Sequence, residues 1–283
     1  MKLKPLLAAI GVVTFALCLN SCKKVNADDE KQDYETTFEL SGDQAISDNF
    51  TEDANQLFLQ VAAENNVAGN GFTSGPVVTN NFIPCATVTI TPLIGFPKTI
   101  VIDFGPACTG PFGIVRSGKI NIVISDSVRN PNSTAIMTFD NYFVSGYKIE
   151  GTYTWTNTST ATTRSWERKT ENGKVTAPTG KYWLHQGIRN VIQTDGVSTP
   201  LDLTDDAFSI TGNHRVTNEA GAYRDITVLE ALQKKNSCHN ISKGKLKVQG
   251  PNHFAVINYG DGTCDNLATI SIDGRPERTI ILW

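Results

Sequence analysis

The chain has 283 residues, of which 40% are hydrophobic, 8% aromatic and 19% charged, and its formal net charge is −3 at pH 7. This length is sufficient for one sizeable hydrophobic core. A nucleic-acid-binding protein usually presents a basic face, and neither the weakly acidic charge nor any interleaving of basic and aromatic residues indicates one. We therefore expect no nucleic-acid partner.

The first residues predict an export signal. Two lysines precede an apolar run over Leu6–Leu19, which is shorter than the ~20 residues of a membrane-spanning helix. The run ends in Leu-Asn-Ser-Cys22, which resembles the bacterial lipobox, with Leu at −3 and a small residue at −1. We expect residues 1–21 to be a lipoprotein signal peptide and Cys22 to carry the lipid. The alternative is an ordinary secretory signal in which this cysteine has no role.

Lipidation at Cys22 predicts a protein that lies on a membrane without spanning it, because two or more acyl chains give stable anchoring. Lys23 follows the cysteine, where Asp typically retains such proteins in the inner membrane, so we expect the outer membrane. The acidic cluster Asp28–Glu30 resembles the surface-export signals of Bacteroidetes lipoproteins. It favours the cell surface over the periplasmic face, although a plain solvated linker has the same composition.

The segment 22–48 is polar, and we interpret it as a lipidated flexible tether because it has too few apolar residues to bury. Residues 49–283 are then expected to form a single β-rich domain that begins with a helix at about 50–66. In that helix, apolar residues recur at three- and four-residue steps and form one stripe: Phe50, Ala54, Leu57, Phe58, Val61 and Ala62.

Beyond residue 85 the hydrophobic period changes to two, which is typical of strands. Clear examples are 99–104, 119–125 and 147–156, and Asx-Gly pairs such as Asn172-Gly173 supply hairpin turns between them. A sheet of more than about ten strands rarely stays flat. We therefore predict an all-β protein, a large antiparallel meander folded into a sandwich or a partly closed barrel, with one N-terminal α-helix.

Four cysteines remain besides Cys18 and Cys22, and an even number in an exported protein points to disulfides. Between Cys85 and Cys108, and again between Cys238 and Cys264, a strand pattern leads to an aromatic residue followed by Gly. Ten residues after the second cysteine of each pair, a Gly is followed by a basic residue. This repeat predicts two pseudo-repeated hairpins, 85–124 and 238–282, with bridges Cys85–Cys108 and Cys238–Cys264. Each bridge is expected to contribute ~3–4 kcal/mol. A chance likeness of two Gly-rich hairpins is the alternative.

The motifs of catalysis and metal binding are missing or incomplete. Residues 113–119 match the first seven positions of a Walker A loop, but Ile120 stands where Ser or Thr must hold Mg²⁺. The four histidines form no close ligand pair, and no GxSxG elbow occurs. Asp205-Asp206 and the turn 261–265 fit polar turns, although carboxylates paired across strands could serve a glycosidase. We expect no catalytic residue, cofactor or metal.

Aromatic residues crowd the middle third of the chain. Tyr147, Tyr153 and Trp155 are separated by even steps and so share one face of a strand, and Trp166 and Trp183 follow on later strands. If exposed, these five side chains could stack on sugar rings or contact lipid chains. If buried, they belong to the core.

Several phrases of the body resemble a family of Bacteroidetes lipoproteins of unknown function. They are Phe96–Gly105, Cys108–Gly110, Arg116–Ile120, Phe139–Tyr147, Ser209–Gly212 and Tyr259–Asn266. They cover nearly all of the body after residue 84. The resemblance implies export and an unassigned role, and it brings no catalytic residues to carry over.

These features predict an outer-membrane-anchored lipoprotein that is a non-enzymatic binding or structural module of the envelope. Its expected partners are the membrane, through the lipid, and a glycan, a lipid or an envelope protein. Two alternatives stay open. A hydrolase acting on envelope or extracellular polysaccharide requires two carboxylates, or a carboxylate and a His, in one cleft. An accessory subunit of an envelope complex requires an exposed apolar patch.

Overall fold

The computed structural model describes residues 27–69, 77–78, 81–199 and 202–282. They form a single α-helix, α1 (Ala27–Glu64), a short 3-10 helix, η1 (Pro111–Gly113), and a sheet of fifteen strands. The predicted signal peptide and Cys22 lie outside the described residues. None of the described helices has the length and apolar character needed to cross a membrane.

The sheet is an antiparallel meander in which nearly every strand pairs with the next one along the chain. The strands are β1 (Val77–Val78), β2 (Thr87–Thr91), β3 (Lys98–Asp103), β4 (Cys108–Thr109), β5 (Val115–Ile124), β6 (Thr134–Val144), β7 (Tyr147–Asn157), β8 (Ser165–Thr176), β9 (Tyr182–Asp195), β10 (Ala207–Asn218), β11 (Tyr223–Lys235), β12 (Lys243–Gln249), β13 (Phe254–Asp261), β14 (Leu267–Ile272) and β15 (Arg278–Ile281). Only β4 leaves this order, as a side partner of β5. The predicted all-β meander with one N-terminal helix is confirmed.

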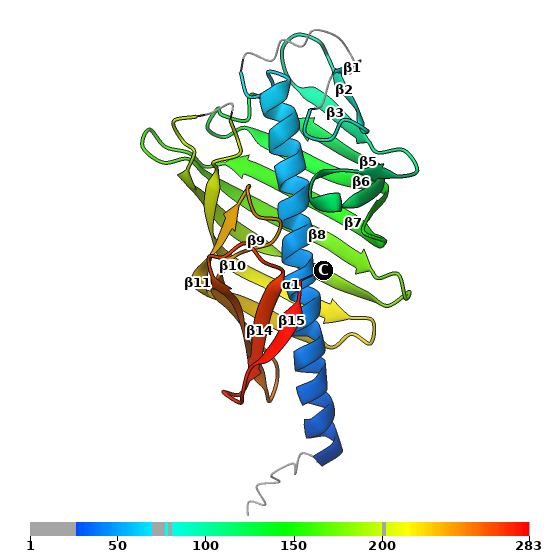
Figure 1. Ribbon diagram of the computed structural model, residues 1–283, viewed down its shortest axis with the longest axis vertical. Coiled ribbons are helices and arrows are strands. Elements are labelled where there is room, and N and C mark those ends of the chain that lie inside the picture. Colours follow the sequence, from blue (N-terminus) through cyan, green and yellow to red (C-terminus); the bar gives the residue numbers. More distant parts are fainter. Residues whose placement is uncertain (1–26, 70–76, 79–80, 200–201, 283) are drawn as a thin grey trace, which may run out of the picture.

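The sheet curls around α1, which runs along its concave face from end to end (Figure 1). No described pairing joins β1 to β15, so the described strands form one unclosed sheet. Bulges bend the strands, because an extra residue in one strand increases its twist. Gly118 in β5 and Gly151 in β7 lie at two such register shifts with φ of 79° and 120°. A Cβ atom on Gly118 would lie 2.0 Å from the carbonyl oxygen of Asn141.

Alternate strand residues point inward and form the apolar part of the core. In β3, for example, Ile100 and Ile102 are fully buried, whereas Thr99 is exposed and Val101 is half-buried. The C-terminal third of α1 contributes Leu57, Phe58 and Val61 to the same core. Complete burial of each such side chain stabilises the fold by about 1.5–3 kcal/mol.

The structure corrects the prediction of a flexible tether over 22–48. Residues 27–48 are the first half of one continuous 38-residue helix, which ends at Glu64 rather than at 66. The polar composition misled the prediction because polar side chains of this half are buried with partners. Ser41 is fully buried and its hydroxyl donates to the carbonyl of Thr37 at 2.6 Å. The folded body therefore includes residues 27–48 instead of beginning at 49.

Both predicted disulfides are confirmed, with sequence separations of 23 for Cys85–Cys108 and 26 for Cys238–Cys264. Each encloses a two-stranded hairpin, β2–β3 or β12–β13, and a third antiparallel strand follows. The likeness of the two hairpins does not extend to the glycine that follows the second cysteine by ten residues. Gly118 lies inside β5, whereas Gly274 lies in the turn between β14 and β15.

The two disulfide-bonded loops meet beside the middle of α1. Phe112, four residues after Cys108, stacks on His239, which follows Cys238, with ring centroids 5.6 Å apart. The second loop also contacts the helix directly, because the backbone N–H of Ile241 donates to the Asn49 side chain at 3.0 Å. The loops thus close around the helix where the sheet itself stays open.

Candidate functional site

The concave face of the sheet carries cations that pair with acidic residues of α1. The pairs run along the helix in the order Asp33–Arg224, Asp43–Lys181, Asp48–Arg189, Glu52–Arg168 and Asp53–Arg116. An unpaired charge in such a position is costly, so each partner requires the other. The Asp48–Arg189 pair, at 2.9 Å, has both side chains less than 7% exposed. These charges hold the helix in place and are not open to a ligand.

Burial perturbs the titration of several groups beneath the helix. It raises the pKa of Asp43 to about 6, although Lys181 donates to both carboxylate oxygens at 3.0 Å. It lowers the pKa of His185 to about 4, and the pKa of the neighbouring His214 falls well below its usual value. The two imidazoles lie 6.1 Å apart between ring centroids. Both are therefore neutral at physiological pH.

The aromatic residues predicted for ligand stacking do not form an exposed surface. Tyr153, Trp155, Trp166 and Trp183 are buried, and Tyr147 is half-buried against Phe50 of α1. Two of the indoles form hydrogen bonds with α1: the N–H of Trp155 donates to Asn55 and that of Trp183 donates to Ser47, both at 2.7 Å. Exposure was the condition for surface stacking, so that prediction is wrong. These rings are core, and Trp166 alone of the five also lines the cleft described next.

A cleft opens at the C-terminal end of α1, beside the ends of β8, β9 and β10. Its apolar wall includes Leu59 and Ala63 of α1, Val128, Trp166, Leu203 and Phe208. Its polar wall is formed by Arg129, Arg164, Gln193 and Asp206. About 530 Å³ between the walls, including the open mouth, is free of protein atoms. Ligand pockets commonly have such mostly apolar walls with a few placed polar groups.

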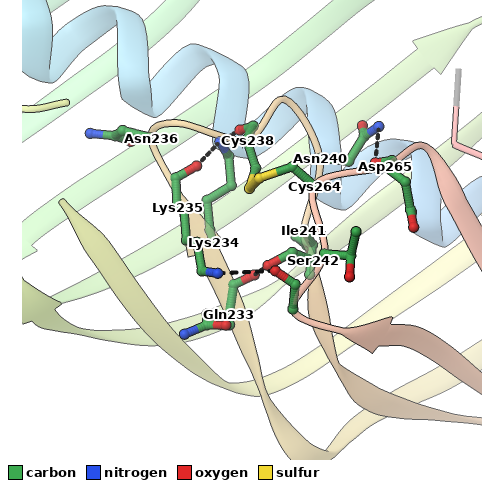
Figure 2. The surroundings of a disulfide bond; sticks show 12 residues. Gln233, Lys234, Lys235, Asn236, Cys238, Asn240, Ile241, Ser242, Cys264 and Asp265 are labelled. Carbon is green, nitrogen blue, oxygen red and sulfur yellow. Dashed lines mark hydrogen bonds between the residues drawn. A yellow bond between two sulfur atoms is a disulfide. The ribbon is translucent and has the colours of Figure 1, made fainter. Parts of the chain in front are cut away.

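A smaller space, about 300 Å³ with its open side counted, adjoins the cleft along the helix and is called the inner chamber below. Leu59, Trp166 and Phe208 line both spaces and form the boundary between them. The lining of the inner chamber includes charged side chains, and these ions already have partners. Lys234 donates to the carbonyls of Lys235 and Cys238 beside the second disulfide (Figure 2), and burial lowers its pKa to about 8.

Asp206 is the unusual acid of the cleft. Its side chain is 4% exposed, and the amide of Gln193 donates to one carboxylate oxygen at 2.7 Å. Burial, with help from the charge of Asp205, raises the pKa of Asp206 to about 7. The carboxyl group is thus only partly ionised at neutral pH. The guanidinium groups of Arg129 and Arg164 lie at the same end of the cleft.

Two further sequence candidates have structural roles. In the turn 261–265, a carboxylate oxygen of Asp261 accepts from the backbone N–H and the hydroxyl of Thr263, at 3.0 and 2.7 Å. The Walker-like segment runs into β5, where Lys119 pairs with Asp103 on the surface at 2.9 Å. Within the described ranges, no group of three His, Cys, Asp or Glu side chains could hold a metal ion.

The sequence predictions missed Arg129 and Arg164 and interpreted Asp205-Asp206 as a plain polar turn. The three cleft groups come from a loop before β6, the residue before β8 and the residue before β10, so no local motif joins them. The ion pairs of α1, in contrast, could have been anticipated from the sequence of the strands. Arg168 and Arg189 occupy inward-facing positions of β8 and β9, as the burial pattern of those strands shows. A cation on the buried face of a strand requires a buried partner.

Comparison of this chain with known protein families, with curated proteins and with solved structures finds no match.

Proposed function

We propose that this protein is an outer-membrane lipoprotein, anchored through Cys22, whose body is a non-enzymatic module that binds a small ligand in the cleft at the end of α1. The cleft is the observation that carries the proposal. It combines an apolar wall with Arg129, Arg164 and Asp206, and binding sites for small molecules usually combine these features. The envelope location follows from the lipobox-like segment before Cys22.

The position of α1 supports a cleft that faces away from the anchoring membrane. Ala27 opens the helix, and the five residues from Cys22 to that point span at most about 18 Å. The helix itself has 38 residues and is therefore about 57 Å long at 1.5 Å per residue. The cleft adjoins its far end, because Leu59, Ala62 and Ala63 of the helix line it. We infer that the ligand reaches the cleft from the aqueous side.

The cleft is tested with N-phenyl-1-naphthylamine, an uncharged apolar probe whose fluorescence rises on binding. We expect the mature chain to bind the probe and Ala63→Trp, which fills the cleft from the helix side, to abolish the signal. Thr138→Trp, on an exposed position of β6, is the matched control and should bind as the wild type does. Unchanged binding by Ala63→Trp would refute the cleft as the ligand site.

Anchoring and orientation need a separate experiment in cells. Cys22→Ala should move the protein from the detergent phase to the aqueous phase, because the variant lacks the residue that receives the lipid. Protease treatment of intact cells should then cleave the wild-type body if it faces outward. Cleavage only after lysis would place it on the periplasmic side and contradict the surface location.

A hydrolase is a second candidate because the raised pKa of Asp206 is typical of a general acid. Hydrolysis by a carboxylate pair needs a second acid across the cleft. Among the described lining residues, Asp206 is the single carboxylate, and none is a histidine. The non-enzymatic proposal therefore has the stronger support, and release of reducing sugar from envelope polysaccharide, lost in Asp206→Asn, would reverse this order.

A further inference from the structure

We infer that the cleft binds an anionic amphiphile, a ligand with a carboxylate or phosphate head and an alkyl chain, whose head lies at Arg164 and Arg129 and whose chain lies against Leu59, Trp166 and Phe208. The inference rests on the proposed function, since it names the ligand class of the same cleft. Three independent features of the cleft carry it.

The first feature is the pair of guanidinium groups in the polar wall. Burial lowers the pKa of Arg129 and the charge of Arg164 lowers it further, which indicates that the two guanidinium groups lie near each other. Within the described chain Arg164 makes no ion pair. Asp206 lies near Arg129, and its raised pKa leaves this carboxyl group partly protonated at pH 7. Guanidinium groups bind carboxylates and phosphates through paired, charge-assisted hydrogen bonds.

The second feature is the apolar wall, which excludes a small inorganic anion as the complete ligand. Leu59 and Ala63 from the helix face the opening together with Trp166 and Phe208 from the sheet. Burial of an alkyl chain there contributes ~0.8 kcal/mol per methylene. Beyond Leu59 the inner chamber is lined by the buried Glu52–Arg168 pair together with Trp155 and Val191.

The third feature is an unsatisfied donor. The indole Nε1 of Trp166 is buried without a hydrogen-bond partner among the described residues, whereas the indoles of Trp155 and Trp183 both donate to α1. Buried donors are nearly always paired in folded proteins. Trp166 lines the cleft and the inner chamber, so the head of the ligand, or a water beside it, is the natural acceptor, while the alkyl chain contacts the indole ring.

Displacement of N-phenyl-1-naphthylamine from the mature chain tests the inference with four competitors that share a twelve-carbon chain. They are laurate, dodecyl phosphate, dodecanol and dodecyltrimethylammonium. We expect the two anions to displace the probe at concentrations at least about tenfold lower than the alcohol or the cation. A preference between laurate and dodecyl phosphate then identifies the head group, and equal displacement supports recognition of the shared negative charge.

Arg164→Gln should weaken displacement by laurate about tenfold more than it changes displacement by dodecanol, and circular dichroism shows that the variant is folded. Arg215→Gln is the matched control, because Arg215 is an exposed arginine paired with Asp225 at 2.7 Å on the sheet surface. Equal displacement by dodecanol or by the cation, or an unaffected Arg164→Gln variant, would overturn the ligand class. That outcome is distinct from a failure of the proposed cleft, which shows itself as probe binding that persists in Ala63→Trp.

Discussion

The sheet and α1 are held by different physical means. The strands bury alternate apolar side chains and pair with their neighbours in the chain, as Ile100 and Ile102 do in β3. The first two thirds of α1 instead bury acids, amides and hydroxyls; the acids pair with cations of the sheet side, and hydroxyls such as that of Ser41 donate to carbonyls of the helix itself. Hydrophobic patterning consequently predicts the sheet well and misses the first half of the helix. A polar segment is not by itself evidence of a solvated one.

The largest expected effect comes from deletion of residues 27–48. A flexible tether could be shortened without harm, whereas the structure places Asp33, Asp43 and Asp48 of this segment in ion pairs with the sheet. We expect the deletion variant to lose its cooperative unfolding transition by circular dichroism. Deletion of the exposed residues 27–29 is the control and should keep it. A stable fold without 27–48 would restore the tether interpretation.

A single buried ion pair gives the next largest effect. Asp48→Ala leaves Arg189 buried without its partner, and removing one member of a buried pair typically costs about 3–5 kcal/mol. Asp225→Ala breaks the exposed Arg215–Asp225 pair on the convex side, which is 43% and 53% exposed, and should cost less than about 1 kcal/mol. Urea denaturation measures both. Similar losses for the two variants would show that the charges under α1 do not hold it.

Removal of either disulfide should cost slightly less. The Cys238–Cys264 bridge closes a loop of 26 residues, which corresponds to about 3–4 kcal/mol of chain entropy. We expect the double variant Cys238→Ala/Cys264→Ala to lose this free energy of unfolding, and its loop also to release the contact of Ile241 with α1. The pair Cys85→Ala/Cys108→Ala is the comparison. Amide exchange of helix residues 49–56 should rise more in the first variant than in the second.

The smallest effect concerns pH. Because burial lowers the pKa of His185 to about 4, the unfolded chain binds a proton more readily, and stability is lost as pH falls from about 6.5 towards 4. Between pH 7 and pH 5 the wild type should lose about 2 kcal/mol more than His185→Gln. Asp43, whose raised pKa acts in the opposite direction, changes equally in both proteins. Parallel pH profiles would mean that His185 is hydrated or protonated in the fold.

Particular residues show what the sequence could predict. Tyr147–Asn157 alternates and is β7, and the matched cysteine spacings give both disulfides. Neither depends on knowing how distant segments meet. Arg129, Arg164 and Asp206 do depend on it, since only the curl of the sheet brings their separate loops to one end of α1. Their chemistry was visible in the sequence, but their proximity was not.

The placement of α1 also determines an order of events in time. Its ion pairs join residues 63, 116, 141 and 191 positions apart, whereas adjacent strands need only short hairpins to meet. Contacts between distant residues form slowly, because the intervening chain must first be ordered. The ion pairs of the helix are complete only once β11 is available, and further partners such as Ile241 come later still. We therefore expect the meander to assemble first and α1, although synthesised before every strand, to dock last.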